Sequence, residues 1–301
     1  MNSFEFYWKL TRPHTLTASI IPPLVGISYA LYADMVFHPV LALVMILCAM
    51  LIQIATNLFN EYYDYKNGLD TKDTVGIGGA IVREGIAPKA VLAAAFGIYG
   101  ISGILGVVLA WNTSWILLLI GALCLLIGYC YTGGPYPISR SPFGEAFAGT
   151  LMGTGYCMIA YYTQTGYITW GAFAASIPIN ILVGLLLTAN SLRDLVPDKA
   201  NGRRTLAILL GHERTLLFMI SGFTLAYFWL IVLFAYGHSV IILLPLLSIP
   251  FAIHCVTSFE SHNQTPRKMM RGMIYCSKTN KYFGILFIVA LFVEALIKII
   301  F

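Results

Sequence analysis

The sequence predicts an all-α protein, a multi-pass bundle of membrane-spanning helices that forms one transmembrane domain over residues 1–301. Hydrophobic residues make up 58% of the chain and charged residues 10%, against roughly 25% charged residues in soluble domains. This composition excludes a soluble globular protein. The 14% of aromatic residues excludes a disordered one, because disordered chains have few apolar groups to bury. An integral membrane protein remains.

Stretches without Asp, Glu, Lys or Arg indicate eight membrane spans, since a spanning helix needs about 20 residues. One span each is expected in 13–33 and 35–60, and two each in 90–139, 146–192 and 215–259. The apolar tail 282–301 adds a ninth, although it contains charged residues. Polar or glycine-containing turns divide the double stretches at 111–113, 163–166 and 236–238. In the last span, Glu294 and Lys298 are four residues apart and are expected to form an ion pair.

The basic residues predict the orientation. Every Lys and Arg except Lys298 lies before the first expected span or in every second loop. By the positive-inside rule, the N-terminus and these loops are expected in the cytoplasm and the C-terminus outside. We therefore expect a protein of the cell membrane, in contact with the lipid bilayer and not with nucleic acid. The oligomeric state stays open.

Acidic residues gather in two of the loops expected in the cytoplasm. Residues whose side-chain oxygens can bind a metal lie at or just after the ends of the second and sixth expected spans. They are Asn60, Asp64 and Asp70 in the first cluster, and Asn190, Asp194 and Asp198 in the second. A spacing of four places side chains on one face of a helix. The clusters are about 130 residues apart, which indicates an internal four-helix duplication.

Carboxylates that converge from two helices repel one another unless a cation lies between them. Mg²⁺ prefers oxygen ligands and is usually held by one or two carboxylates together with substrate phosphates. We expect the metal ligands to be Asn60, Asp64, Asp70, Asp194 and Asp198, all of them except Asp70 being essential for catalysis. Interleaved arginines are expected to contact phosphate oxygens: Arg83, Arg140, Arg193, Arg203 and Arg204. The alternative is that all these groups are solvated loop charges.

Several segments resemble the UbiA-type intramembrane aromatic prenyltransferases. Residues 60–64 with 68–70, and 190–194 with Asp198, are similar to the two aspartate-rich motifs of that family. The segments 12–16, 78–80 before Arg83, and 131–135 are similar to its 1,4-dihydroxy-2-naphthoate branch, which makes menaquinone precursors.

Two departures from the family pattern concern site residues. Glu61 and Gly68 stand where the first motif usually has aspartates, and Glu61 is not counted among the expected metal ligands. The family's Tyr-x-x-Lys element, which binds diphosphate, corresponds here to Tyr136 with the cation one place later, at Arg140.

The resemblance implies nine helices around a central cavity that is capped by the motif loops and open to lipid for a prenyl tail. It implies transfer of a polyprenyl group from polyprenyl diphosphate to 1,4-dihydroxy-2-naphthoate, with Mg²⁺ as cofactor. Diphosphate and CO₂ are lost, and demethylmenaquinol forms. Arg83 is expected to bind the aromatic carboxylate. The other substrate-binding residues are expected to be Tyr136, Arg140, Asn190, Arg193 and Arg203.

Other functions stay open. A 4-hydroxybenzoate prenyltransferase or a haem-farnesylating enzyme of the same family would share these motifs. An ion-coupled transporter would also place acids around a central site built from repeats. Acids at the span ends on one side favour an enzyme, because the coupling acids of a carrier are expected near mid-span. The prenyl chain length and the number of metal ions also stay open.

Overall fold

The computed structural model describes residues 15–70, 79–260 and 266–300. Within these residues the regular structure is helical throughout, as the sequence predicts. The elements are α2 (Thr17–Asp34), α3 (Pro39–Lys66), α4 (Pro88–Asn112), α5 (Ile116–Cys130), the 3₁₀ helix η1 (Ile138–Arg140), α6 (Gly144–Ala148), the π helix η2 (Gly149–Gly155), α7 (Tyr156–Thr165), α8 (Trp170–Arg193), α9 (Leu195–Ala200), α10 (Leu206–Leu210), α11 (His212–Ala235), the 3₁₀ helix η3 (Val240–Ser248), α12 (Ile249–Phe259) and α13 (Pro266–Ile300).

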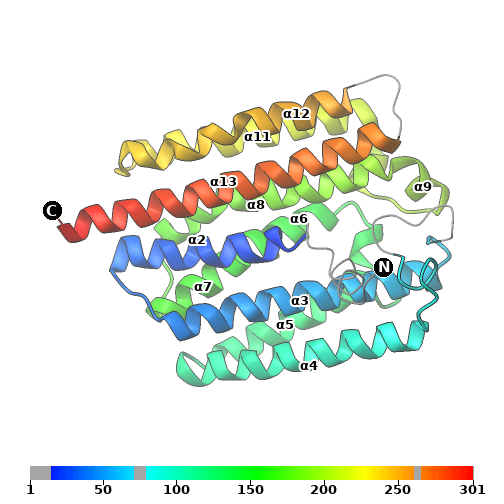
Figure 1. Ribbon diagram of the computed structural model, residues 1–301, viewed down its shortest axis with the longest axis horizontal. Coiled ribbons are helices and arrows are strands. Elements are labelled where there is room, and N and C mark those ends of the chain that lie inside the picture. The colour runs from blue at the N-terminus through cyan, green and yellow to red at the C-terminus, as the bar shows by residue number, and fades with distance from the viewer. Residues whose placement is uncertain (1–14, 71–78, 261–265, 301) are drawn as a thin grey trace.

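The long helices lie side by side, with α9 at one end of the bundle and the C-terminal end of α13 at the other (Figure 1). Among the described residues, six segments are long and apolar enough to cross a membrane: α3, α4, α8, α11, 240–259 and 268–300. The predicted number of nine spans is not confirmed by this criterion. Of the other three predicted spans, the first corresponds to α2, which contains two prolines. The fourth is the 15-residue α5, and the fifth is divided among α6, η2 and α7.

The turns inside the double stretches lie where the sequence predicts them, but the last helix does not begin there. Helix α13 starts at Pro266 and not near residue 282, so the basic residues from Lys268 to Lys281 are helical. Proline is favoured in the first turn of a helix, and Lys and Arg are good helix formers. The change from apolar to charged residues along the sequence therefore does not mark the end of this helix.

The ion pair predicted between Glu294 and Lys298 is wrong. Glu294 accepts hydrogen bonds from the backbone N–H of Ser239 at 2.6 Å and from the Ser239 hydroxyl at 2.7 Å, and it pairs with His238 at 2.7 Å. Lys298 lies over the ring of Tyr32, 3.7 Å from its centroid. Glu294 is buried against the turn between α11 and η3, where a carboxylate needs several donors.

Small residues let the helices approach closely. A Cβ atom at Gly26 of α2 would lie 2.1 Å from the carbonyl oxygen of Cys157 in α7. One at Gly153 would lie 2.5 Å from the Cα atom of Asn180 in α8. In both cases the obstacle is backbone, which a rotamer change cannot relieve. These contacts hold α2 against α7 and η2 against α8.

We expect Gly26→Ala to lower the thermal unfolding midpoint of the detergent-solubilised protein, because overpacking typically costs about 1–3 kcal/mol. Gly103→Ala is the matched control. Gly103 is also helical, in α4, but a Cβ atom there would have no neighbour within 4 Å. Its variant should unfold at the wild-type temperature or slightly above, because alanine favours helix. Equal midpoints for the two variants would show that the α2–α7 contact is not tight.

Candidate active site

A polar cavity of about 180 Å³ lies where α3 and α8 end. The structure brings both predicted clusters to its wall. The lining residues that the sequence singles out are Asn60, Asp64, Asp70, Asn190, Arg193, Asp194, Asp198 and Arg203. Groups about 130 residues apart in sequence thus face one space.

Backbone hydrogen bonds explain the local geometry of the first cluster. The carbonyl oxygen of Asp64 accepts hydrogen bonds from the N–H groups of Leu69 at 2.9 Å and Asp70 at 3.2 Å. The chain reverses at Gly68, whose φ of +72° suits glycine. The glycine that stands where the family's motif usually has an aspartate therefore makes the turn that brings Asp70 to the cavity.

The second cluster keeps its helical row although α8 ends. Asp194 donates its N–H to the carbonyl of Asn190 at 3.0 Å, and Asp198 donates to the carbonyl of Asp194 at 2.9 Å. Hydrogen bonds between residues i and i+4 therefore continue from α8 into α9. This continuity presents all three side chains to the same cavity.

Two arginines neutralise the acids. Arg203 joins the clusters, with one Nη atom 2.7 Å from Asp64 and the other 3.3 Å from Asp198. Arg193 makes two hydrogen bonds to Asp194, one of them from Nε at 2.7 Å. The arginines predicted to bind phosphate thus pair with the carboxylates predicted to bind metal. A bound cation and an anionic substrate would allow both to exchange partners.

Asp198 places a buried carboxyl group in the cavity wall. Asp198 is only 4% exposed. The pKa of its carboxyl group is raised from 3.8 to about 6, chiefly by burial; Arg203 opposes the rise, and the charges of Asp194 and Asp64 contribute to it. The charged form is therefore costly here, and a cation in the cavity would relieve that cost.

The donor set fits a cation held jointly by protein and phosphate. No group of three or more His, Cys, Asp and Glu residues in the described parts of the chain is arranged to hold a metal by itself. Arg203 occupies the space between two of the acids. Buried oxygens without a hydrogen-bond partner remain on Asn60, Thr132 and Thr205, three of the lining residues. Hard oxygen ligands of this kind suit Mg²⁺ together with a diphosphate.

Three predicted substrate-binding residues do not line this cavity. Tyr136 is 91% exposed, Arg83 is exposed and Arg140 is half-buried. The carbonyl of Arg140 accepts a hydrogen bond from the N–H of Arg204 at 2.9 Å, and its neighbour Ser139 reaches the cavity wall. Arg140 is therefore tied to the segment that carries Arg203. The roles assigned to these three residues stay predictions.

Glu61 is buried away from the cavity wall and has a different set of contacts. Its carboxylate accepts hydrogen bonds from the N–H of Gly79 at 2.8 and 3.0 Å and from that of Ile81 at 3.3 Å. The carbonyl of Gly79 in turn accepts a hydrogen bond from the N–H of Arg83 at 2.8 Å. The residue that departs from the family motif thus holds the turn that carries Arg83.

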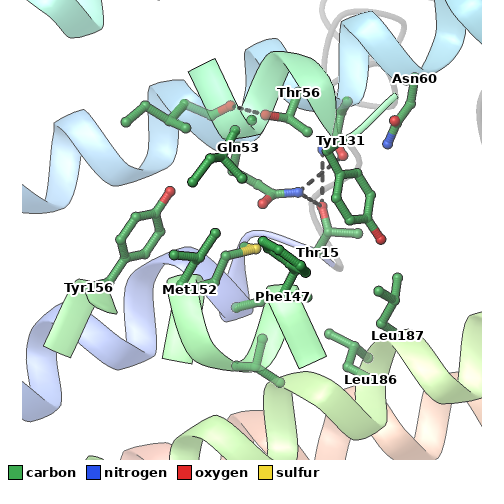
Figure 2. Close-up of a pocket in the computed structure, with 18 of the residues that line it drawn as sticks. Thr15, Gln53, Thr56, Asn60, Tyr131, Phe147, Met152, Tyr156, Leu186 and Leu187 are labelled. Carbon is green, nitrogen blue, oxygen red and sulfur yellow. Dashed lines mark hydrogen bonds between the residues drawn. The ribbon is translucent and has the colours of Figure 1, made fainter. Parts of the chain in front are cut away.

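A second cavity, of about 170 Å³, adjoins the first and extends into the helix bundle. Five residues line both: Thr15, Asn60, Tyr131, Leu187 and Asn190. Its walls are mostly apolar, with Phe147, Met152 and Tyr156 among them (Figure 2). A smaller apolar cavity of about 50 Å³ shares Ile52, Cys124 and Tyr156 with it. Together the three spaces lead from charged groups into the helix bundle.

One wall of the second cavity is polar, and the sequence analysis missed it. Gln53, Thr56 and Asn57 of α3 line it. Gln53, Asn57, Asn60 and Asp64 follow one another at intervals of four, three and four residues, the pattern of one helix face. This polar stripe in an otherwise apolar span is the sequence feature from which the polar wall could have been predicted.

Comparisons with known proteins agree on one family. Residues 19–277 match the profile of the UbiA prenyltransferase family. A 1,4-dihydroxy-2-naphthoate octaprenyltransferase of Bacillus subtilis is 44% identical over 96% of this chain and 93% of its own length. One of Mycobacterium tuberculosis is 32% identical over 71% of this chain and 73% of its own length.

Solved structures show the same fold. A UbiA homologue from Aeropyrum pernix has a TM-score of 0.68 at 16% identity, covering 94% of this chain and 98% of that one. A UbiA homologue from Archaeoglobus fulgidus bound to DMAPP and Mg²⁺ has a TM-score of 0.63 at 14% identity, covering 94% and 99%.

Proposed function

This chain belongs to the UbiA prenyltransferase family, and we propose that it transfers a polyprenyl group from polyprenyl diphosphate to 1,4-dihydroxy-2-naphthoate. The observation that carries this proposal is the shared wall of the two cavities. A diphosphate needs the charged groups of the first cavity, and an isoprenoid chain needs the apolar walls of the second. The reacting carbon of a prenyl diphosphate would then lie at the junction.

The binding groups follow from the geometry. Asp64, Asp194 and Asp198, with the unpaired oxygen of Asn60, would hold Mg²⁺. When bound, the metal neutralises charge on the diphosphate leaving group. Arg203 and Arg193, released from the carboxylates, would donate charge-assisted hydrogen bonds to phosphate oxygens. On substrate binding the acids would thus leave the arginines and pair with the cation, and the arginines would pair with the diphosphate.

The chemistry supported is electrophilic aromatic substitution. The allylic C–O bond breaks, diphosphate leaves with the electron pair, and a ring carbon of the naphthoate forms the new C–C bond. The ring carboxylate leaves as CO₂, and demethylmenaquinol is the product. Apolar side chains such as Phe147 and Met152 would keep water away from the carbocation, which water would otherwise capture.

We also propose that α2, α5 and the α6–η2–α7 segment cross the membrane, which makes nine spans in all. In Figure 1 these helices lie within the bundle, alongside the six apolar segments. The end of the bundle with α9 and the polar cavity would face the cytoplasm of the cell, and the C-terminal end of α13 would lie outside. This orientation gives the cavity access to the soluble diphosphate group and to Mg²⁺.

A direct assay tests the function. Membranes that contain the protein are given labelled prenyl diphosphate, Mg²⁺ and either 1,4-dihydroxy-2-naphthoate or 4-hydroxybenzoate. We expect labelled product with the naphthoate, loss of that product on addition of EDTA, and recovery with excess Mg²⁺. Membranes without the protein are the control. Prenylation of hydroxybenzoate alone would overturn the assignment of the naphthoate as the acceptor. Full activity in EDTA would overturn the proposed requirement for Mg²⁺.

A further inference from the structure

Two amide side chains of α3 lie inside the bundle and have no part in the mechanism above. Gln53 is 9% exposed and Asn57 3% exposed, and both line the second cavity. Polar side chains within membrane helices are costly and often mark a functional site. None of the described residues that line this cavity is charged, and their polar groups suit a neutral part of a ligand.

Hydrogen bonds fix the orientation of Gln53. Its Nε2 donates to Asn57 Oδ1 at 3.1 Å and to Thr15 Oγ1 at 3.4 Å, and Asn57 Nδ2 donates to the same Thr15 oxygen at 3.0 Å. Both donor hydrogens of Gln53 are thus engaged. Its Oε1 accepts no hydrogen bond from any residue that the structure describes. Figure 2 shows this oxygen turned away from Thr15, toward the side where Met152 and Phe147 lie.

The second cavity therefore offers the Gln53 Oε1 acceptor beside apolar surface, in addition to the Asn60 oxygen at its junction with the first cavity. Phe147, Met152 and Leu186 form apolar surface around it. The complementary ligand is a flat apolar ring with a hydroxyl group that donates one hydrogen bond. A buried acceptor left without such a donor is unfavourable, so the site selects for that hydroxyl.

The chemistry of the aromatic acceptor shows which hydroxyl this is. In 1,4-dihydroxy-2-naphthoate the hydroxyl next to the carboxylate forms an internal hydrogen bond with it. The 4-hydroxyl has no partner within the molecule. With the carboxylate toward the charged cavity and the ring at the junction, the 4-hydroxyl points toward the membrane side, where Gln53 lies.

We propose that Gln53 is a specificity-determining residue whose Oε1 accepts a hydrogen bond from the 4-hydroxyl of the aromatic substrate, the hydroxyl that is not adjacent to the carboxylate. Asn57 and Thr15 are positioning residues, because they hold the Gln53 amide with its oxygen toward the cavity. This inference rests on the proposed function, since it takes the naphthoate as the acceptor. It adds a recognition site on the membrane side of the metal-binding clusters.

The test compares two acceptors in two variants. The acceptors are 1,4-dihydroxy-2-naphthoate and 1-hydroxy-2-naphthoate, which lacks the 4-hydroxyl. Gln53→Met keeps a long unbranched side chain but removes the strong acceptor. Thr56→Val is the matched control, because Thr56 lines the same cavity but donates its hydroxyl to the carbonyl of Ile52. The ratio of kcat/KM for the two acceptors is measured in each protein, with KM for prenyl diphosphate alongside.

We expect the acceptor ratio to fall by about 10- to 100-fold in Gln53→Met and to stay within about twofold in Thr56→Val. The two acceptors differ in ring reactivity, but this difference is the same in every variant. It therefore does not contribute to the change in the ratio between variants. KM for prenyl diphosphate should stay within about twofold, because an isoprenoid chain in the same cavity has no group that donates a hydrogen bond to Gln53 Oε1. Gln53→Glu, which retains an acceptor oxygen, should keep part of the preference and provides a second variant if Gln53→Met does not fold.

An unchanged ratio in Gln53→Met would overturn this inference alone. The same conclusion would follow if KM for prenyl diphosphate rose as much as KM for the acceptor, since the amides would then contact the prenyl chain. Wild-type protein that prenylates neither naphthoate would overturn the proposed function as well. The behaviour of the wild type thus separates the two failures.

Discussion

Asp64→Asn, Asp194→Asn and Asp198→Asn should each reduce turnover by about 100-fold or more. A bound metal contributes several kcal/mol to stabilising transition-state charge, and each 1.36 kcal/mol is a tenfold change in rate. All three acids line the cavity, from the ends of two helices that meet there. Asparagine keeps the size and one oxygen but loses the negative charge that the cation requires.

Asp198→Asn offers the clearest separation of activity from folding. Burial raises the pKa of Asp198 above its unfolded value, so the folded protein favours the uncharged form. Above a pH of about 6 the ionised carboxylate therefore weakens folding, and removal of the charge should leave the unfolding midpoint unchanged or raised. Turnover with prenyl diphosphate, Mg²⁺ and naphthoate is measured beside thermal unfolding in the same detergent.

Glu213→Gln is the control for these variants. Glu213 is an exposed carboxylate in the first turn of α11, outside the walls of the cavity. Its loss removes only a helix-dipole contribution of about 0.3–1 kcal/mol. We expect wild-type turnover in this variant. Near wild-type turnover in Asp64→Asn or Asp194→Asn would contradict the assignment of the metal ligands.

Arg203→Ala should change two measurements in opposite directions. Without the guanidinium, prenyl diphosphate loses a charge-assisted contact worth roughly 1.5–3 kcal/mol, which lowers kcat/KM by about one to two orders of magnitude. Without prenyl diphosphate, Asp64 and Asp198 lose the cation that pairs with them at 2.7 and 3.3 Å. The variant should therefore bind Mg²⁺ more tightly than the wild type while it turns over more slowly.

Isothermal titration with Mg²⁺ alone and steady-state kinetics check both parts. Arg204→Ala is the matched control, because Arg204 is the next residue, is exposed and lies outside the cavity walls. It should leave both quantities near wild type. Weaker Mg²⁺ binding in Arg203→Ala would show that Arg203 supports the acids and does not compete with the metal.

The outline of the fold and the central part of the site could be predicted because they depend on local sequence. A bilayer requires long apolar helices with internal backbone hydrogen bonds, so composition and charge-free stretches predict a helical membrane protein. The intervals between Asn60 and Asp64, and among Asn190, Asp194 and Asp198, follow from helical geometry. Motif similarity then indicated that the two clusters belong together, and one cavity has both in its walls.

The pairing of long polar side chains depends on contacts between distant segments, which sequence spacing does not reveal. Glu294 has Lys298 four residues away, yet packing buries it against His238 and Ser239. Glu61 lies in the motif itself, yet it holds the backbone of Gly79. Local spacing shows which partners are within reach along one helix. Burial selects the partner that satisfies the most hydrogen bonds.

The sequence by itself determined the membrane class, the family and the acids of the site. Only the tertiary structure decided that Arg203 lies between the two clusters, that α13 begins at Pro266 and that Gln53 faces the second cavity. The physical reason is the range of the interactions. Hydropathy and helical periodicity act over a few residues, whereas a cavity and its ion pairs exist only where helices far apart in sequence pack together.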